Sequence, residues 1–207
     1  MTNRLSPELT LTGSYEKCWK KINNHWWLYK KENNNEKFSE LFAYQIAELL
    51  DIDTVKYELD DGYIRCENLA SIYNFEPMAS LCDDDDSYQR VFDTLYKISE
   101  SIAVSYLKLM TFDIIINNVD RHNENCGLLR DKKTGRIISL TPNFDNNLSL
   151  LSVDPELTNK DGFLLVFKKF LVNHPIAYDL YQKIHLPCLD EKMIKNILDK
   201  YSKVISL

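Results

Sequence analysis

The chain lacks the features that mark several common classes of protein. Its five cysteines are odd in number and scattered, with no pair at metal-ligand spacing, so we expect buried reduced thiols. A net charge of -6 and a pI of about 5.3 leave no basic excess for a nucleic-acid surface. The sequence has no apolar run that could span a bilayer and no apolar signal core near its start. We therefore expect no direct nucleic-acid partner, no membrane partner and a cytoplasmic location, with secretion without a cleavable signal as the alternative.

The N-terminal part of the sequence is rich in strand-forming residues. The 207 residues, 44% of them hydrophobic, suffice for one sizeable core or two modest lobes, and we expect one domain with two lobes. Strand-forming residues and Gly13 predict a hairpin over 9–31 with Gly13 between its strands. Apolar residues at helical spacing predict a helix over about 35–50. Alternating polarity around Asp60-Asp61-Gly62 predicts a second hairpin of 54–59 with 63–68.

The C-terminal part is mostly helical in pattern. Residues 88–110 carry apolar side chains at helical spacing without proline or glycine, which predicts one long helix. Residues 126–130 and 137–141 flank a charged turn and predict a third hairpin, and the remainder predicts helices over 175–184 and about 190–205. The complete pattern indicates an α+β fold.

Two polar motifs stand out against apolar surroundings. Residues 117–125 (NNVDRHNEN), here named the polar loop, lie between apolar runs whose burial forces the polar groups to find partners or a ligand. Residues 142–146, here named the PNFDN segment, follow the third predicted hairpin. Asp120, Asn125 and Asp145 supply one carboxylate that can accept a hydroxyl proton and two oxygen ligands for magnesium. Phosphoryl transfer requires this set of groups.

The two motifs also resemble those of a known family. VDRHNENCGLLRD followed by LTPNFDNNLSL is similar to the catalytic and metal-binding segments of HipA-like serine/threonine kinases. The resemblance implies that ATP is the phosphoryl donor, that Asp120 is the catalytic base, and that Asn125 and Asp145 hold magnesium. His122 is expected to pack and to orient the loop, because Asp120 already fills the role of base. The matching residues are Asp120, His122, Asn125, Pro142, Phe144, Asp145, Ser149 and Leu150.

A kinase also needs a lysine for the phosphates and an acidic residue that holds this lysine. The sequence WWLYK resembles the strand that ends in the phosphate-binding lysine, which favours Lys30. Lys31 is the alternative, since a register shift of one residue exchanges the two faces of a strand. Glu40 matches the family's position for the acidic partner, and Glu36, one turn earlier on the same helix face, is the alternative.

Residues 11–17 occupy the place of a phosphate-covering loop. One glycine gives this segment one permissive backbone position, whereas ordinary protein kinases use three glycines. HipA-like proteins often have a Gly-x-x-x-Lys pattern here, which Gly13 and Lys17 reproduce. The resemblance suggests autophosphorylation at the hydroxyls on this loop, which belong to Thr10, Thr12 and Ser14. Ser14 is also a candidate nucleotide-binding residue.

The end of the second predicted hairpin is expected to lead into a hinge between two lobes. Backbone groups of Glu67 and Leu69 would bind adenine there, as the resemblance implies. The resemblance also implies a protein-kinase-like bilobal fold. Its small N-lobe of strands and one helix spans residues 1–68, and its larger, mostly helical C-lobe spans residues 69–207.

The expected function is that of an ATP- and magnesium-dependent serine/threonine protein kinase. The family suggests a toxin or a delivered effector that acts on a protein with a Ser or Thr acceptor, with an antitoxin-like protein as a candidate partner. A kinase of a lipid or small molecule is one alternative, because DRHNEN also resembles the catalytic loop of phosphoinositide kinases. A pseudokinase that binds a partner without phosphoryl transfer is the other.

Overall fold

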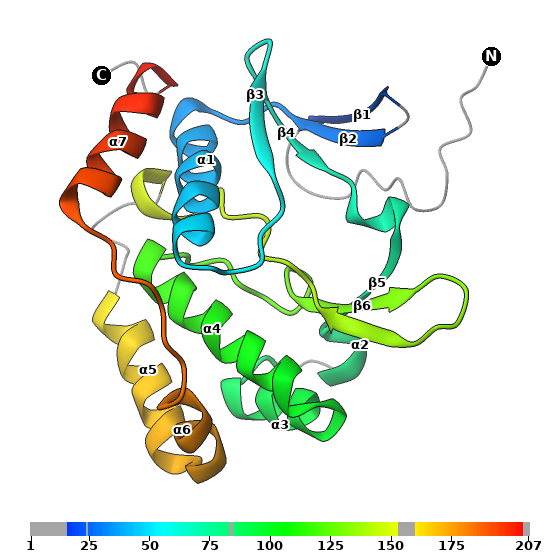
Figure 1. Ribbon diagram of the computed structural model, residues 1–207, viewed down its shortest axis with the longest axis vertical. Helices are drawn as coiled ribbons and strands as arrows, with labels where there is room; N and C mark the ends of the chain where they lie inside the picture. Colours follow the sequence, from blue (N-terminus) through cyan, green and yellow to red (C-terminus); the bar gives the residue numbers. More distant parts are fainter. Residues whose placement is uncertain (1–15, 24, 83–84, 153–159, 205–207) are drawn as a thin grey trace.

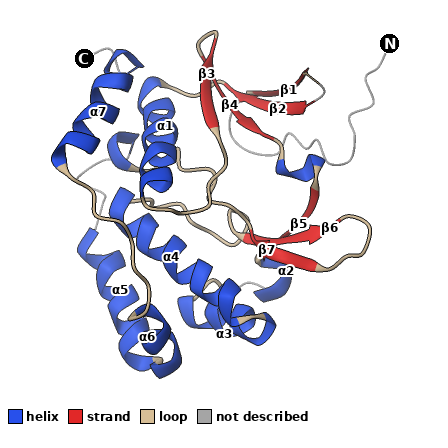
Figure 2. Ribbon diagram, in the orientation of Figure 1, coloured by secondary structure: helices blue, strands red, loops and turns tan. Residues whose placement is uncertain are grey.

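The structure, a computed structural model, describes residues 16–23, 25–82, 85–152 and 160–204. It is an α+β fold with two antiparallel sheets and helices around them (Figures 1 and 2). The first sheet and α1 lie at the top of Figure 1, and helices α3 to α6 lie at the bottom. The elements of the upper part are β1 (Lys17–Ile22), β2 (His25–Lys30), α1 (Asn34–Leu49), β3 (Tyr57–Asp60) and β4 (Tyr63–Glu67).

The first sheet has the strand order β1-β2-β4-β3. A hairpin forms in this region, and its strands β1 and β2 pair from Lys17 with Lys30 to Ile22 with His25. Gly13 and the strand predicted before it lie outside the described residues. The chain reverses next to Asn23, whose φ is 49°. Asparagine tolerates this left-handed conformation better than most residues do. The second hairpin pairs as predicted around Asp61 and Gly62.

Helix α1 confirms the predicted helix at 35–50. A capping box begins it: the Asn33 side chain accepts from the backbone N–H of Glu36, and the Glu36 carboxylate accepts from the backbone N–H of Asn33. Its apolar face includes Phe38, Leu41 and Ile46. This face packs into one core with residues of β3, β4, α4 and α7. The helix is therefore fixed at its start and along one side.

A second sheet was only partly predicted. Strands β6 (Gly127–Asp131) and β7 (Ile137–Leu140) form the predicted third hairpin, and β5 (Tyr73–Pro77) joins β6 on its other side. The 3-10 turn η1 (Leu69–Ser71) connects β4 in the first sheet with β5 in the second. Gly127 lets β5 and β6 approach, because a Cβ atom at this residue would lie 2.2 Å from the backbone oxygen of Glu76.

The predicted single helix over 88–110 is wrong, since two helices occupy this region and the residues after it. Helix α3 (Tyr88–Ile98) ends and α4 (Glu100–Ile116) begins at Ser99, whose extended backbone has φ −165° and ψ 135°. The two helices pack against each other. The break lets the apolar faces of both helices enter one core, with Phe92 of α3 and Leu107 of α4 fully buried.

The remaining helices are the short α2 (Ala79–Cys82), α5 (Lys160–Asn173), α6 (Pro175–Tyr181) and α7 (Glu191–Tyr201), together with the 3-10 turns η2 (Leu150–Ser152) and η3 (Ser202–Val204). Of these helices, α6 and α7 match the predicted helices at 175–184 and about 190–205, and α2 and α5 were not predicted individually. The chain returns from α6 to the upper part, where α7 packs beside α1 (Figure 1). Ile197 and Tyr201 of α7 enter the same core as α1.

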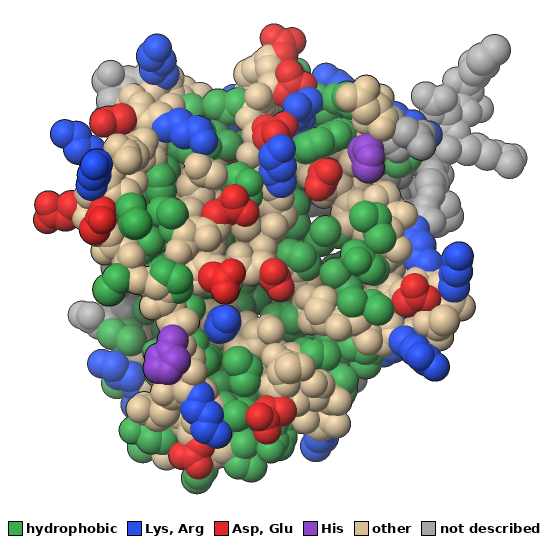
Figure 3. All heavy atoms as spheres, viewed as in Figure 1, with side chains coloured by type: hydrophobic (Ala, Val, Ile, Leu, Met, Phe, Trp, Pro, Cys, Tyr) green, Lys and Arg blue, Asp and Glu red, His purple; other side chains and the backbone are tan. Residues whose placement is uncertain are grey.

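The surface mixes charges of both signs. On the face seen in Figure 3, acidic and basic side chains alternate and do not gather by sign. Within the described ranges, every helix is too short or too polar to cross a lipid bilayer.

Candidate functional site

Lys30 lies at the centre of a buried ionic cluster. It ends β2 and is 4% exposed. Its Nζ donates to Oε1 of Glu40 at 2.8 Å and to Oδ1 of Asp145 at 2.5 Å. Oε1 of Glu32 is 3.4 Å from the same nitrogen. Strand β2, helix α1 and the PNFDN segment thus each bring one charged side chain to one point, although Asp145 follows Lys30 by 115 positions.

The two alternative residues lie outside this cluster. Lys31 points to the surface, where its Nζ is 3.1 Å from Oε2 of Glu16. Glu36 belongs to the capping box of α1. Of the two lysines and two glutamates considered from the sequence, the structure brings Lys30 and Glu40 together.

Burial and neighbouring charges shift the pKa values in the cluster. Burial alone would lower the pKa of Lys30, but Glu40, Tyr57, Asp145 and Glu32 hold it well above its ordinary value. Burial likewise opposes ionisation of Asp145, yet the charge and hydrogen bond of Lys30 lower the pKa of this carboxyl below its ordinary value. Burial raises the pKa of Glu32 to about 8 despite Lys30. Lys30 and Asp145 are therefore ionised near neutral pH, and Glu32 is largely protonated.

The PNFDN segment is held by its backbone. Asp145 has a left-handed backbone with φ 58°, and its N–H donates to the hydroxyl of buried Tyr57 at 2.9 Å. The N–H of Asn146 donates to Oε2 of Glu40 at 2.9 Å. Glu40 therefore binds Lys30 with one oxygen and the PNFDN segment with the other. This contact couples the position of α1 to that of Asp145.

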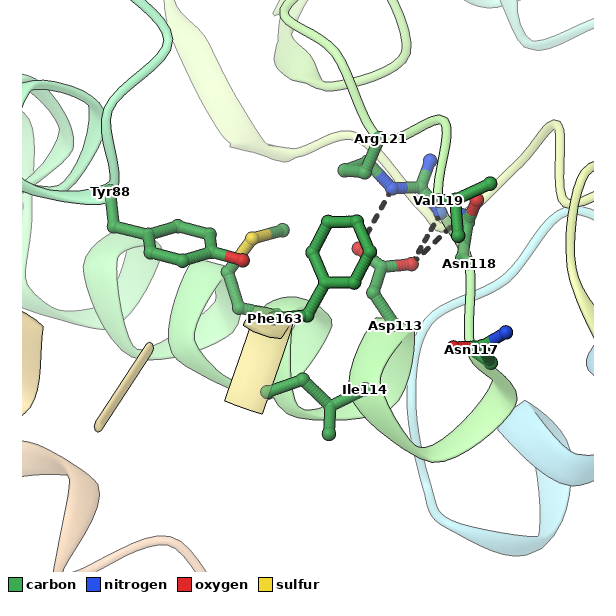
Figure 4. A pocket seen from close by; sticks show the side chains of 9 residues that line it. Tyr88, Asp113, Ile114, Asn117, Asn118, Val119, Arg121 and Phe163 are labelled. Atoms are coloured by element: carbon green, nitrogen blue, oxygen red, sulfur yellow. Dashed lines mark hydrogen bonds and ion pairs between the residues drawn. The ribbon is translucent and has the colours of Figure 1, made fainter. Parts of the chain in front are cut away.

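Arg121 joins the polar loop to the PNFDN segment. Its Nη1 donates to the backbone oxygens of Asn125 at 2.9 Å and Phe144 at 2.8 Å, one from each segment. Its Nε and Nη2 form a bidentate pair with Asp113 of α4, both at 3.0 Å (Figure 4). Its Nη2 also approaches Oδ1 of Asn143 and of Asn146. The backbone N–H of Val119 donates to the oxygen of Leu148 at 3.2 Å and adds a second link between the two regions.

The other predicted residues of the polar loop lie beside this link. The Asp120 side chain is 40% exposed, and its Oδ2 is 3.9 Å from Nε2 of His122. Asn125 is buried, and its Nδ2 donates to the backbone oxygen of Asp120 at 3.3 Å. Nδ1 of His122 accepts from the N–H of Glu124 at 3.2 Å, and the orienting role of His122 stays a prediction. Asp120 thus presents its carboxylate to solvent from a loop fixed by Arg121 and Asn125.

The predicted nucleotide-contacting residues are only partly described. Gly13 and Ser14, with Thr10 and Thr12, lie outside the described residues. Lys17 is opposite Lys30 in the β1–β2 pair, and its charge helps to lower the pKa of Asp145. Glu67 ends β4 on the surface.

The predicted hinge coincides with the connection between the sheets. Leu69 opens η1, and its backbone oxygen accepts from the N–H of Ile72 at 3.1 Å. The Leu69 carbonyl already accepts a hydrogen bond within the chain. The backbone N–H of Leu69 is therefore the group for which the adenine contact stays a prediction.

The chemistry of the Asp145 and Asn125 side chains fits magnesium, which prefers carboxylate and amide oxygens, and Arg121 Nη1 binds the backbone oxygens of Asn125 and of Phe144, the residue before Asp145. Asp145 is ionised, and among the described residues no donor reaches Oδ1 of Asn125. Separately, Glu32, Glu40 and Asp145 each offer an oxygen within 4.8 Å of the others, with the Lys30 ammonium among them. Sequence reasoning missed Glu32, although residues two apart on an extended strand share a face, so its spacing from Lys30 was a usable signal.

Comparison with known proteins supports the fold. The chain superimposes with a TM-score of 0.58 on a proinflammatory kinase, CtkA, of Helicobacter pylori, at 18% identity and covering 93% of this chain and 80% of that one. It superimposes with a TM-score of 0.53 on a Shewanella oneidensis MR-1 structure of HipA with HipB and operator DNA, at 12% identity, covering 97% of this chain and 64% of that one. No family model and no curated protein matches the sequence.

These similarities concern the fold. The chain has an α+β fold similar to those of the kinase CtkA and of HipA, as the resemblance of its motifs implied. It spans less than two thirds of the HipA chain. The lobe boundary near residues 68 and 69 stays a prediction.

Proposed function

We propose that the chain is an ATP- and magnesium-dependent kinase that phosphorylates Ser or Thr hydroxyls of proteins. The observation that carries this proposal is the contact of one buried ammonium, Lys30, with both Glu40 and Asp145. Active protein kinases require a strand lysine paired with a helix glutamate next to a metal-binding aspartate. The kinase-like fold supports the same conclusion.

The residues of the site have separate roles in this proposal. The Asp120 carboxylate accepts the proton of the acceptor hydroxyl as the hydroxyl oxygen bonds to the γ-phosphorus. The bond from the γ-phosphorus to the bridging oxygen breaks, and ADP leaves with that electron pair. Lys30 binds phosphate oxygens. Asn125 and Asp145 would hold magnesium, which neutralises charge on the phosphates.

Arg121 positions these groups and takes no part in proton transfer. It is buried, its guanidinium remains charged at every accessible pH, and its N–H groups are directed at protein acceptors. It therefore fixes the spacing between the loop that carries Asp120 and the segment that carries Asp145. A fixed spacing matters because positioning supplies much of the rate enhancement in phosphoryl transfer.

The experiment compares the full chain with Asp120→Asn in the presence of labelled ATP, magnesium and a generic protein substrate. The wild type should transfer label, and Asp120→Asn should transfer it at least about 100-fold more slowly while retaining its melting temperature, because this side chain is exposed. Glu124→Gln, an exposed charge removal in the same loop, is the matched control and should behave as wild type.

Three other outcomes would contradict the proposal in different ways. Nucleotide binding without transfer by the wild type would favour a pseudokinase. Transfer only to a phosphoinositide or a small molecule would favour the other acceptor class. Equal transfer by Asp120→Asn would remove Asp120 from the mechanism. An intact-mass spectrum of the same sample would test autophosphorylation, which adds whole multiples of the phosphate mass.

A further inference from the structure

A pocket borders the polar loop on the side formed by helices α3, α4 and α5. Figure 4 shows the Asp113–Arg121 pair behind the ring of Phe163, with Tyr88 extending towards this ring from α3. The cavity measures about 60 Å³, which accommodates a few water molecules or one aliphatic side chain but no nucleotide base. Its lining residues are Tyr88, Met110, Asp113, Ile114, Asn117, Asn118, Val119, Arg121 and Phe163.

The charged groups in this pocket are already neutralised. Asp113 and Arg121 bind each other through two hydrogen bonds of 3.0 Å, and the five N–H groups of Arg121 face six acceptor contacts within the protein. A charged ligand would lose hydration in the pocket without gaining a free counter-charge. The remaining walls are largely apolar, which favours an apolar group.

Asn117 adds one polar contact point. It caps α4 in a left-handed conformation with φ 52° and is 6% exposed. Among the described residues, no hydrogen bond satisfies its side-chain amide. The amide atoms of Asn117 remain accessible to solvent, since they are not among the fully enclosed polar atoms without a partner, so a ligand with a polar group next to its apolar part could bind this amide. The backbone of an extended peptide has this composition.

The pocket lies against the part of the polar loop that carries Asp120. Val119 and Arg121 line it, and they are the two chain neighbours of Asp120. An extended peptide advances about 3.3 Å per residue. The pocket wall therefore lies one residue along the chain from Asp120, a distance that the side chain one or two residues from an acceptor hydroxyl can span.

We infer that the pocket bounded by Phe163, Ile114 and Asn117 binds an apolar side chain one or two residues from the acceptor Ser or Thr of a protein substrate. This inference rests on the proposed function and adds the substrate class to it. The ligand is an extended peptide with a neutral, aliphatic or aromatic residue close to the hydroxyl. An acidic or basic residue at the same position is disfavoured.

The test uses the full chain, magnesium-ATP and a peptide set that carries one Ser with each amino acid in turn at the flanking positions. At one flanking position, kcat/KM for Leu or Met should exceed that for Asp or Lys by about tenfold or more. Phe163→Ala and Ile114→Ala should reduce this ratio to about threefold or less. Leu165→Ala, an exposed apolar residue two positions later on α5 and outside the pocket, should leave the ratio unchanged.

The possible results separate the inference from the proposed function. Transfer without a flanking preference, or with a preference that both pocket variants retain, overturns the inference and leaves the proposed function intact. A preference for a charged flanking residue overturns it as well. If the wild type phosphorylates none of the peptides and no protein, both the inference and the proposed function are overturned. Because Phe163 and Ile114 are tested separately and compared by melting temperature, loss of folding in one variant leaves the other to decide.

Discussion

The Lys30 ammonium and the Asp145 carboxylate lie 2.5 Å apart, although 115 positions separate them in the chain. Two more carboxyl groups, those of Glu40 and Glu32, lie within 3.4 Å of the same nitrogen. One cation thus serves three acids in a buried site. An excess of acid over base in low dielectric has consequences for how the stability of the protein depends on pH.

The first prediction concerns Glu32. Its pKa is about 8 in the folded chain against an ordinary value of 4.5, so the folded state binds the proton more tightly than the unfolded state. This contribution to stability is complete below pH 4.5 and is lost as pH rises through about 8. The free energy of unfolding should therefore fall by roughly 2 to 4 kcal/mol between pH 5 and pH 8.5 in the absence of metal and nucleotide.

Urea unfolding at each pH measures this change. Glu32→Gln keeps the shape and removes the titration, so its stability should vary much less over the same range and should exceed that of the wild type at pH 8.5. Equal slopes in the two proteins would show that Glu32 does not carry the effect. Asp145 cannot account for it, because its lowered pKa affects stability only at pH values below its ordinary range.

The second prediction concerns the link formed by Arg121. Lysine cannot reproduce the planar, forked donor geometry, so Arg121→Lys should leave the acceptors at Asp113, Asn125 and Phe144 without partners. We expect a loss of about 3 to 5 kcal/mol in the free energy of unfolding, measured with urea. Arg136→Lys on the exposed turn between β6 and β7 should cost less than about 0.5 kcal/mol. Similar values for the two variants would refute the structural role of Arg121.

The third prediction separates two reasons for having a glycine. Gly127→Ala places a Cβ 2.2 Å from a backbone oxygen, so β5 and β6 must move apart at a cost of about 2 kcal/mol or more. Gly135→Ala meets no atom within 4 Å but has a φ of 69°, so it should cost about 1 kcal/mol through backbone strain alone. Thermal melts of both variants test this order. A Gly127→Ala protein as stable as the wild type would contradict the close approach of the strands.

The fourth prediction concerns the packing of α7 on α1. Ile197 is 6% exposed and its neighbour Leu198 is 42% exposed, which makes a matched pair on one helix. Ile197→Ala should destabilise the protein by about 2 to 4 kcal/mol and should speed amide hydrogen exchange in α1. Leu198→Ala should cost less than about 1 kcal/mol. If exchange in α1 stayed at the wild-type rate, α7 would not support that helix.

Local patterns in the sequence predicted much of the fold. Helix α1 has its signals within one short segment, in the cap at Asn33 and the apolar spacing that follows. The Asp61-Gly62 turn similarly determines the β3–β4 hairpin. Asp120 and Asn125 lie in one short loop, so their spacing, together with Asp145 and the family resemblance, suggested a catalytic base and a metal ligand. These features require no knowledge of distant contacts.

Features that depend on distant residues escaped prediction. Strand β5 pairs with β6, which begins 50 positions after β5 ends, and its own sequence YNFEP has weak strand propensity. Neither proline nor glycine marks the helix break at Ser99 in the sequence. The break arises because α3 and α4 pack on each other. The partners of Arg121 come from three separate segments. Such contacts are decided by the tertiary structure.

The attachment of α7 to α1 also bears on how the protein folds. About 140 residues separate the two helices, and closing so long a loop is slow, because the chain loses conformational freedom before the contact forms. Until α7 arrives, α1 and the first sheet lack part of their apolar cover. The upper half of the molecule therefore cannot mature ahead of the lower half, and we expect both to unfold together in a single cooperative step.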